Sequence, residues 1–365
     1  MKTDRTPGGS GKPSPAQLTL REPSDLAAAV PYLLGFHPSE SLVVVGLRGP
    51  VAAVVQRWDL AEDAGGLAAA ITELVASAPV AAVMLAGYGS AEAVRPVVAE
   101  LRARLPVPVI GAVRVTGDRC FCELCEDCTP EEGYPFDITV SPVAAQATVA
   151  GLAALPSREA LIEQVAPVGG EAAAGMRQAA QVADARLAAL LRRSRGGDDP
   201  LSVAAVQSAG FEAVDAALGA GRRGERLDDD QVAWLVLLLH SLPVRDRAWE
   251  STDHEPWQLS LWTDLTRRAD PRIAAPPAAI LAFAAWRDGN GPLAGAALER
   301  ALDADPDYSL ALLIEDAMLR GLPGAYLGAW PSLRQPGPSG RPSRRRTSRG
   351  HAFRRGRAAA SGGRA

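Results

Sequence analysis

The order of the predicted segments limits the fold of this chain more than any other feature. Two short β-type runs come first, and a helix-type segment followed by a strand-type segment then occurs twice. The β-type runs at 41–47 and 51–58 are separated by Arg48-Gly49-Pro50, a turn-forming group that predicts a hairpin. Helically spaced apolar residues then alternate with strands at 80–86 and 107–115. This β-β-α-β-α-β order predicts a mixed sheet with two parallel crossover connections.

From about Ser141 onward the apolar spacing is helical, which predicts an all-α domain after the α/β domain. Ser157 and Asp228 are expected start signals of its helices, and Ser24 is the expected N-cap of a helix that precedes the first β-type run. Near its end, small residues followed by the Asp305-Pro306 break resemble one tetratricopeptide-type helical hairpin. The predicted plan is therefore a disordered leader at 1–17, an α/β domain at 18–155, an all-α domain at 156–327 and a disordered Arg-rich tail at 328–365.

The chain carries no apolar signal at its start and no apolar run near the roughly 20 residues that span a bilayer. All four cysteines lie between Cys120 and Cys128, so they cannot link distant parts of a secreted fold. We therefore expect a cytoplasmic protein with no membrane partner.

The formal net charge of −4 conceals an acidic body and a basic tail. Residues 331–365 hold ten Arg and no acidic residue, and the rest of the chain has 28 basic against 42 acidic residues. An acidic body disfavours nucleic acid as a partner, except through the tail. The abrupt change of composition at the tail is also typical of a frameshifted gene end.

Strand order predicts where a site would lie. Ligands of open α/β sheets bind at the carboxyl ends of the parallel strands, and the amino end of an antiparallel neighbour lies at the same edge. Four segments should therefore converge at one edge: 36–41, 58–59, 87–90 and the loop at 116–136.

A hydrolase needs a base and a nucleophile, and this edge offers both. The candidate residues are a histidine, a serine hydroxyl and two carboxylates: His37, Ser39, Glu40 and Asp59. The alternative is structural, with the serine capping a turn and the histidine making one backbone hydrogen bond. Tyr88 and Ser90 belong to a glycine-rich strand-to-helix turn whose N–H groups could hold an anion, although such turns are usually only turns.

Cys120, Cys122, Cys125 and Cys128 form the most unusual local pattern of the chain. Four thiolates can complete a tetrahedral zinc site, although nine crowded residues leave little freedom to wrap one ion. Three of the cysteines also have iron–sulfur spacing, but the required fourth position is Glu132. Metal-free thiols that form a reversible local disulfide are the remaining alternative.

Several segments together resemble an actinobacterial family called domain of unknown function 4192. The most specific is Gly35-Phe36-His37-Pro38 with Ser41-Leu-Val-Val44, and the others are Ser141–Ala144, Leu155–Leu161, Val244–Asp246, Leu281–Trp286 and Asp305–Ala311. The resemblance covers about Leu18 to Leu322 and implies the domain plan but no activity. Relatives usually carry an adjacent cysteine pair that is absent here, while Cys120 and Cys122 are additional.

The absence of a strong catalytic motif favours a non-enzymatic regulatory or interaction protein, with a small-ligand pocket at the sheet edge and a protein partner bound by the helices. A hydrolase and a metal or redox switch at the cysteine loop are the alternatives. The sequence identifies no substrate, ligand or oligomeric state.

Overall fold

The computed structural model of the chain describes residues 20–60, 63–125, 128–193, 200–253, 255–322 and 324. Its β-structure is one sheet of six strands in the order β2-β1-β3-β4-β5-β6. The strands are β1 (Ser41–Arg48), β2 (Val51–Asp59), β3 (Ala82–Tyr88), β4 (Val109–Thr116), β5 (Arg119–Cys122) and β6 (Tyr134–Pro135).

Strand β1 lies between the edge strand β2 and strand β3, and it runs antiparallel to both. Strands β3 and β4 are parallel, and β5 returns antiparallel to β4. The predicted hairpin and mixed sheet are therefore confirmed. The strand order, with β1 inserted between two strands that run the other way, was not predicted.

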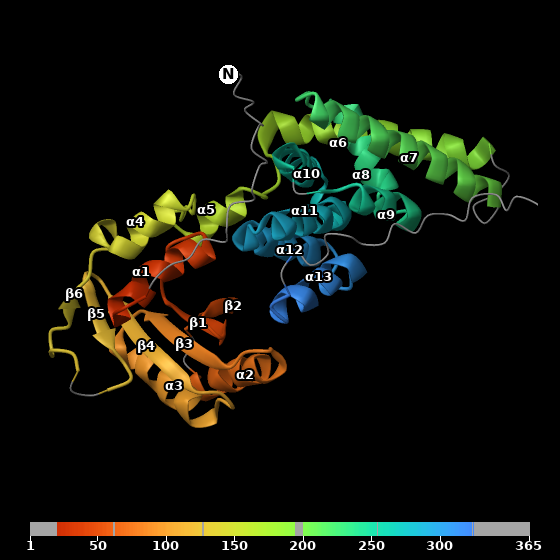
Figure 1. Cartoon of the computed structure of the whole chain (residues 1–365). Helices are drawn as coiled ribbons and strands as arrows, with labels where there is room; N and C mark the ends of the chain where they lie inside the picture. The colour runs from red at the N-terminus through yellow and green to blue at the C-terminus, as the bar shows by residue number, and fades with distance from the viewer. Residues whose placement is uncertain are drawn as a thin grey trace, which may run out of the picture. The chain divides into compact units, whose positions relative to one another are not determined.

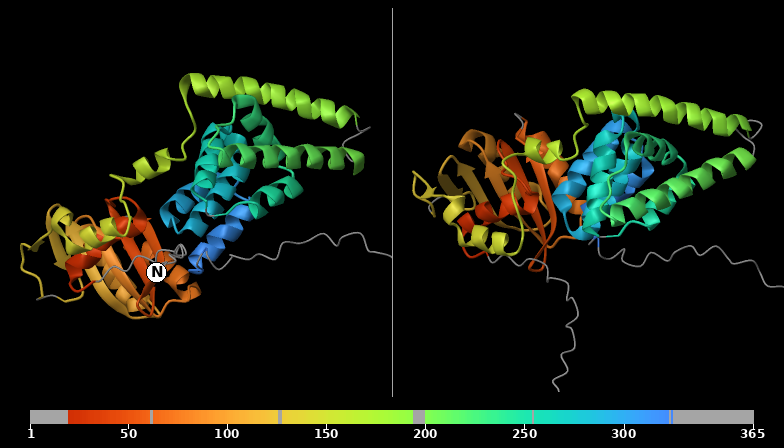
Figure 2. Two further views of the ribbon diagram at one scale, coloured as in Figure 1. Left: turned by 45° about the horizontal axis from the view of Figure 1, so that its top comes forward. Right: turned by 90° about the horizontal axis from the view of Figure 1, so that it is seen from above.

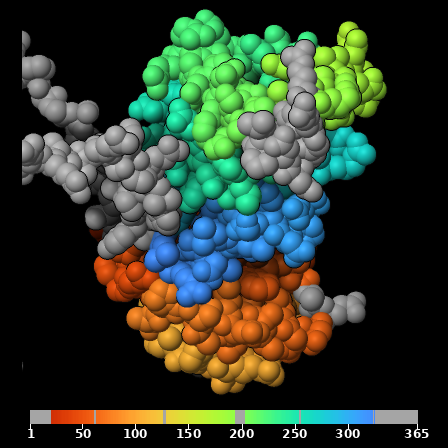
Figure 3. Space-filling view, turned by 90° about the vertical axis from the view of Figure 1, so that its right-hand side faces the viewer, coloured from red at the N-terminus to blue at the C-terminus, as the bar shows by residue number. Residues whose placement is uncertain are grey.

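Helices cover both faces of the sheet because alternate residues of the central strands are apolar on each side. On one face lies α1 (Pro23–Leu34), with α4 (Pro142–Val149) packed against it, and on the other lie α2 (Ala64–Ser77) and α3 (Ala91–Arg104) (Figure 1). Figure 3 shows the orange residues of this part of the chain at the molecular surface. Val43 and Val45 face the first layer, whereas Leu42 and Val44 face the second. This two-sided burial explains why β1 reads as a continuous apolar run.

Two local predictions are corrected. Helix α1 begins at Pro23 with Glu22 as its N-cap, two residues before the expected Ser24, because proline is favoured at the first helical position and Asp25 completes a capping box. The segment 116–136, predicted as a loop, contains β5 and β6, which are too short to leave a periodic signal.

Beyond the sheet the described chain is helical, and the prediction of no further strand is confirmed for those residues. Figure 2 shows the two longest helices, α6 and α7, with α8 against both of them. The helices are α5 (Arg158–Glu163), α6 (Gly170–Arg193), α7 (Pro200–Arg222), α8 (Asp229–Leu238), α9 (Leu242–Glu250), α10 (Pro256–Arg268), α11 (Ala275–Asp288), α12 (Gly291–Ala304) and α13 (Ser309–Leu319). Two 3₁₀ turns occur at Ile138–Val140 and Pro271–Ile273.

The start signals in this region explain several helix boundaries. The side chains of Ser157 and Asp228 accept hydrogen bonds from the first turns of α5 and α8, as predicted. Helix α11 ends at Gly289 in the left-handed region, and α12 follows after Asn290 and packs along it. This is a helix pair in the predicted place, and its assignment as a tetratricopeptide unit stays a prediction.

The core of the helical region is formed by completely buried apolar side chains, among them Trp262, Leu265, Ile280 and Leu281. Trp234 and Trp286 are also buried, which agrees with a packing role for the tryptophans of this region. Among the described residues, no helix is both long enough and apolar enough to span a lipid bilayer. The leader at 1–17 and the tail at 328–365 lie outside the described residues.

Candidate functional site

Strand register brings the predicted segments to one edge of the sheet. Ser41, at the start of β1, pairs with Asp59 at the end of β2 and with Tyr88 at the end of β3. Tyr88 in turn pairs with Val115 near the end of β4. The histidine turn, the Asp59 corner, the glycine-flanked tyrosine and the start of the cysteine segment therefore share the edge that the sequence predicted.

The four residues proposed for hydrolysis are near this edge but are not joined to one another. Nη2 of Arg57 donates to a carboxylate oxygen of Asp59 at 2.5 Å, and this hydrogen bond holds the pKa of Asp59 below its usual range. The backbone N–H of His37 donates to the carbonyl of Leu155 at 2.9 Å. No hydrogen bond links the side chains of His37, Ser39, Glu40 and Asp59, all of which are described.

Glu40 has an unusual backbone conformation. Its φ of 41° makes it the non-glycine residue with positive φ among those described. Its carboxylate lies over Gly89, where Oε2 would be 3.3 Å from an added Cβ. A negative group thus already lies beside the turn that leads into α3, where a bound anion was considered.

Tyr88 and Ser90 have structural partners. The Tyr88 hydroxyl donates to the carbonyl of Ala27 in α1 at 2.9 Å, and burial raises the pKa of this phenol. The Ser90 hydroxyl accepts from the N–H of Ala93 at 3.3 Å and so caps α3. Both contacts fit the structural interpretation of this turn, and ligand binding by these residues stays untested.

A buried ion pair connects this edge to the cysteine segment. Arg114 in β4 donates from Nε to Glu123 Oε1 at 2.7 Å and from Nη1 to Thr116 Oγ1 at 2.7 Å. The side chains of Arg114 and Glu123 are only 5% and 7% exposed. Arg95 of α3 holds the other carboxylate oxygen of Glu123 at 3.1 Å, so both oxygens of this carboxylate are occupied.

Three cysteine sulfurs gather at the end of β5 and in the residues that follow it. Sγ of Cys122, Cys125 and Cys128 all lie within 4.8 Å of one another. Cys125 and Cys128 form a disulfide, and the free thiol of Cys122 lies 3.5 Å from the Cys125 sulfur. Cys122 is half-buried, whereas the other two are exposed to solvent. The arrangement can exchange disulfide partners or, once reduced, present three thiolates to one ion.

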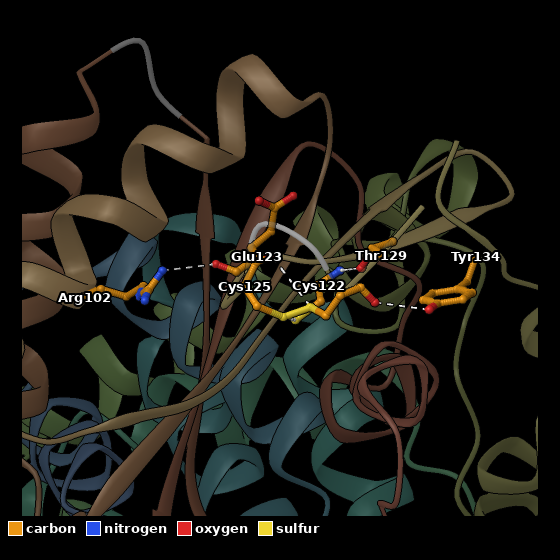
Figure 4. The surroundings of a disulfide bond; sticks show 7 residues. Arg102, Cys122, Glu123, Cys125, Thr129 and Tyr134 are labelled. Atoms are coloured by element: carbon orange, nitrogen blue, oxygen red, sulfur yellow. Dashed lines mark hydrogen bonds between the residues drawn. A yellow bond between two sulfur atoms is a disulfide. The ribbon is translucent and has the colours of Figure 1, made fainter. Parts of the chain in front are cut away.

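Backbone contacts hold this segment in place (Figure 4). The N–H of Cys122 donates to Thr129 Oγ1 at 2.9 Å, and the Tyr134 hydroxyl donates to the carbonyl of Cys128 at 3.1 Å. In the same view the carboxylate of Glu123 points away from the sulfur atoms. Glu123, which is next to Cys122 in the sequence, therefore directs its carboxylate to Arg95 and Arg114 and not to the thiols.

Cys120 lies apart from this group. It is 3% exposed, in the apolar layer beneath α1, and it does not belong to the three-sulfur cluster. Burial raises the pKa of its thiol to about 11, with a further contribution from Cys122. The structure therefore brings together three of the four cysteines that were considered as metal ligands.

The Arg114–Glu123 pair was not predicted from the sequence, although one signal was present. Arg114 interrupts the apolar run of the predicted strand 107–115, and a charged residue in a strand covered on both faces requires a partner. Its pairing with Glu123 could not be predicted, because Glu123 directly follows β5 and this strand is too short to leave a periodic signal.

The chain is similar to a known protein family. A family model described as Domain of unknown function (DUF4192) matches residues 23–325. No curated protein matches the chain, and no solved structure matches it either.

Proposed function

The chain belongs to the family described as Domain of unknown function (DUF4192), which assigns no activity, and we propose that it is a regulatory protein with a thiol–disulfide switch at the sheet edge. One observation carries the proposal: the free Sγ of Cys122 lies 3.5 Å from Sγ of Cys125, which is bonded to Cys128. The output that we propose is binding of a protein partner by the helical region. The proposed compartment is the cytoplasm, where thiol systems reduce such bonds.

The chemistry needs no group from outside the loop. The Cys122 thiol loses its proton to water, and the resulting thiolate attacks Sγ of Cys125. A Cys122–Cys125 bond forms, the Cys125–Cys128 bond breaks, and Cys128 leaves as a thiolate. No net oxidation occurs, so the free thiol moves from one end of the segment to the other.

Accessibility supports reversible chemistry at this place. Cys125 and Cys128 are exposed, so a small reductant or oxidant can reach both sulfurs. The contacts of Thr129 and Tyr134 with the loop backbone keep the three sulfurs close. Glu123, which would otherwise repel a thiolate, is paired with Arg95 and Arg114.

A hydrolase is less well supported. The carboxylate of Asp59 is paired with Arg57, and the lowered pKa makes it a weaker base. Ser39 contributes its carbonyl to Arg57, at 3.5 Å, and no contact activates its hydroxyl. These contacts favour the structural interpretation of the histidine turn.

A small-ligand pocket at the same edge is a second candidate, favoured by the left-handed backbone of Glu40. Strained residues persist where the surroundings hold them, and they concentrate at binding sites. In a Glu40→Gly variant we expect unchanged or higher stability and weaker retention of any metabolite that co-purifies with the native chain. A variant that retains the same metabolite would contradict this candidate.

The switch is tested by differential alkylation and mass spectrometry of the full chain across glutathione redox buffers. We expect Cys125, together with either Cys128 or Cys122, to become protected in oxidising buffers and to react again on reduction. Cys122→Ser should slow exchange at the loop, whereas Cys120→Ser, the matched control, should not. Cysteines 125 and 128 that stay reactive in every buffer would overturn the proposal.

The regulatory part has its own test. Full-length protein locked by Cys125→Ser with Cys128→Ser, and oxidised wild-type protein, are used to capture partners from the native host. We expect a reproducible difference between the two sets. Identical sets would contradict regulation through this loop while leaving the disulfide chemistry intact.

A further inference from the structure

We propose that the reduced form of the loop binds one Zn²⁺ ion through the thiolates of Cys122, Cys125 and Cys128, so that oxidation to the disulfide releases the metal. The inference rests on the proposed switch, because two of the three ligands are the sulfurs that form the disulfide. The inference names a divalent metal ion as the ligand of the reduced site and the released ion as the product of oxidation.

The distances between the three sulfur atoms are close to those of a zinc site. A tetrahedral zinc ion with Zn–S distances of about 2.3 Å holds its sulfurs roughly 3.8 Å apart. The three Sγ atoms lie within 4.8 Å of one another, and Cys122 and Cys125 are 3.5 Å apart. Reduction has only to separate Cys125 from Cys128 by about 2 Å, which is the difference between a disulfide bond and that spacing.

The spacing of the cysteines in the sequence and the turn that follows them also fit a zinc site. Cys122 and Cys125, and again Cys125 and Cys128, are each separated by two residues, the spacing of a zinc knuckle. The turn that closes the loop is held by the N–H of Gly133, which donates to the carbonyl of Pro130 at 2.9 Å. Because these backbone contacts do not use the sulfurs, they persist when the thiols are reduced.

Two neighbouring groups that could compete as ligands are held elsewhere. Both carboxylate oxygens of Glu123 are held by Arg114 and Arg95. Cys120 is buried in the layer beneath α1. Three protein ligands then leave the fourth position of the ion to water or to an external thiol, an open arrangement that also favours exchange.

The redox step balances with a peroxide as the oxidant. Hydrogen peroxide takes two electrons from the thiolates of Cys125 and Cys128 and two protons from water, giving two water molecules and one disulfide. Two of the three ligands are lost in this step. The ion is therefore released, and the remaining thiol of Cys122 is left beside the new bond.

The test uses the full chain, reduced with a phosphine and supplied with zinc alone. We expect one zinc per chain by elemental analysis, and a cobalt-substituted sample with thiolate-to-metal absorption. Cys122→Ser, Cys125→Ser and Cys128→Ser should each weaken binding by at least tenfold. The control is Cys120→Ser, which replaces a cysteine two residues before the first ligand and should bind zinc as the wild type does. Circular dichroism checks that each variant is folded.

The outcomes separate the metal site from the switch. Reduced protein that binds no zinc, or binds it equally well in the three variants, overturns the zinc site, and reversible disulfide formation in that protein leaves the proposed function standing. Zinc that is bound but not released by peroxide, with no Cys125–Cys128 disulfide formed, overturns the proposed function. Stoichiometric release together with disulfide formation supports both.

Discussion

Nε of Arg114 donates to the carboxylate of Glu123 at 2.7 Å, and both side chains are almost completely buried. Arg114 belongs to β4, whereas Glu123 directly follows Cys122, the last residue of β5. The guanidinium of Arg114 also lies 3.8 Å from the ring centre of Phe121. This pair therefore fixes the position from which the cysteine loop leaves the sheet.

Replacing Glu123 by Gln should destabilise the protein. The change removes the charge that compensates Arg114 while leaving the buried guanidinium in place, and we expect a loss of about 2–4 kcal/mol in the free energy of unfolding. Urea unfolding followed by circular dichroism measures it. Glu100→Gln is the control, because the Glu100–Arg104 pair is 43% and 47% exposed and should contribute less than about 0.5 kcal/mol. Equal losses in both variants would contradict the role of burial.

Cys120 predicts a specific dependence of stability on pH. Because burial raises its pKa to about 11, the folded state holds the thiol proton more tightly than the unfolded state. The resulting stability is fully present below the unfolded pKa of about 8.5 and is lost as the pH rises through about 11. The difference in unfolding free energy between wild type and Cys120→Ala should fall by roughly 2–3 kcal/mol over this interval. A constant difference between pH 7 and pH 11, measured with a reductant present, would show that the thiol is not buried.

Gly133 should not tolerate alanine. Its φ of 77° is left-handed, and an added Cβ would lie 2.6 Å from the Phe121 ring. Gly117 offers a matched position, with φ of 60° and no atom within 4 Å of an added Cβ. Gly117→Ala should cost about 1 kcal/mol from the backbone alone. Gly133→Ala should cost at least about 1 kcal/mol more, and thermal or urea unfolding compares the two.

Thr252 tests the polar contacts inside the helical region. Its hydroxyl accepts from Nε1 of Trp262 at 3.0 Å, and both side chains are buried. Thr252→Val keeps the shape but leaves the indole N–H without a partner, which should cost about 1–3 kcal/mol. Thr266→Val is the comparison, because the Thr266 hydroxyl only donates to the helix carbonyl of Trp262. A smaller loss for Thr252→Val than for Thr266→Val would contradict this interpretation.

Most of the fold could be predicted because its signals are local. Apolar alternation and the Gly49-Pro50 turn give the hairpin, and helical spacing gives α2 and α3. Strand order could not be obtained in this way. Nothing in the residues of β1 says that its second edge pairs with β3 instead of staying open, because that pairing depends on packing over a long separation.

For the candidate site, too, the position of the segments could be predicted and the directions of the side chains could not. The crossover rule placed Ser41, Asp59 and Tyr88 at one edge, and their register agrees. The directions of the side chains were beyond the sequence. That Tyr88 turns inward to Ala27, and that Cys120 lies in the core while Cys122 lies 3.5 Å from Cys125, depends on how β5 pairs with β4.

The position of β1 between β2 and β3 has a consequence for synthesis on the ribosome. When the first hairpin has emerged, one side of β1 is already paired with β2, but the other side awaits β3, which lies beyond the whole of α2. During that interval an apolar strand presents an open template to other nascent chains. Translation that stalls within α2 should therefore produce aggregation-prone fragments, and fragments that extend past β3 should be markedly less so.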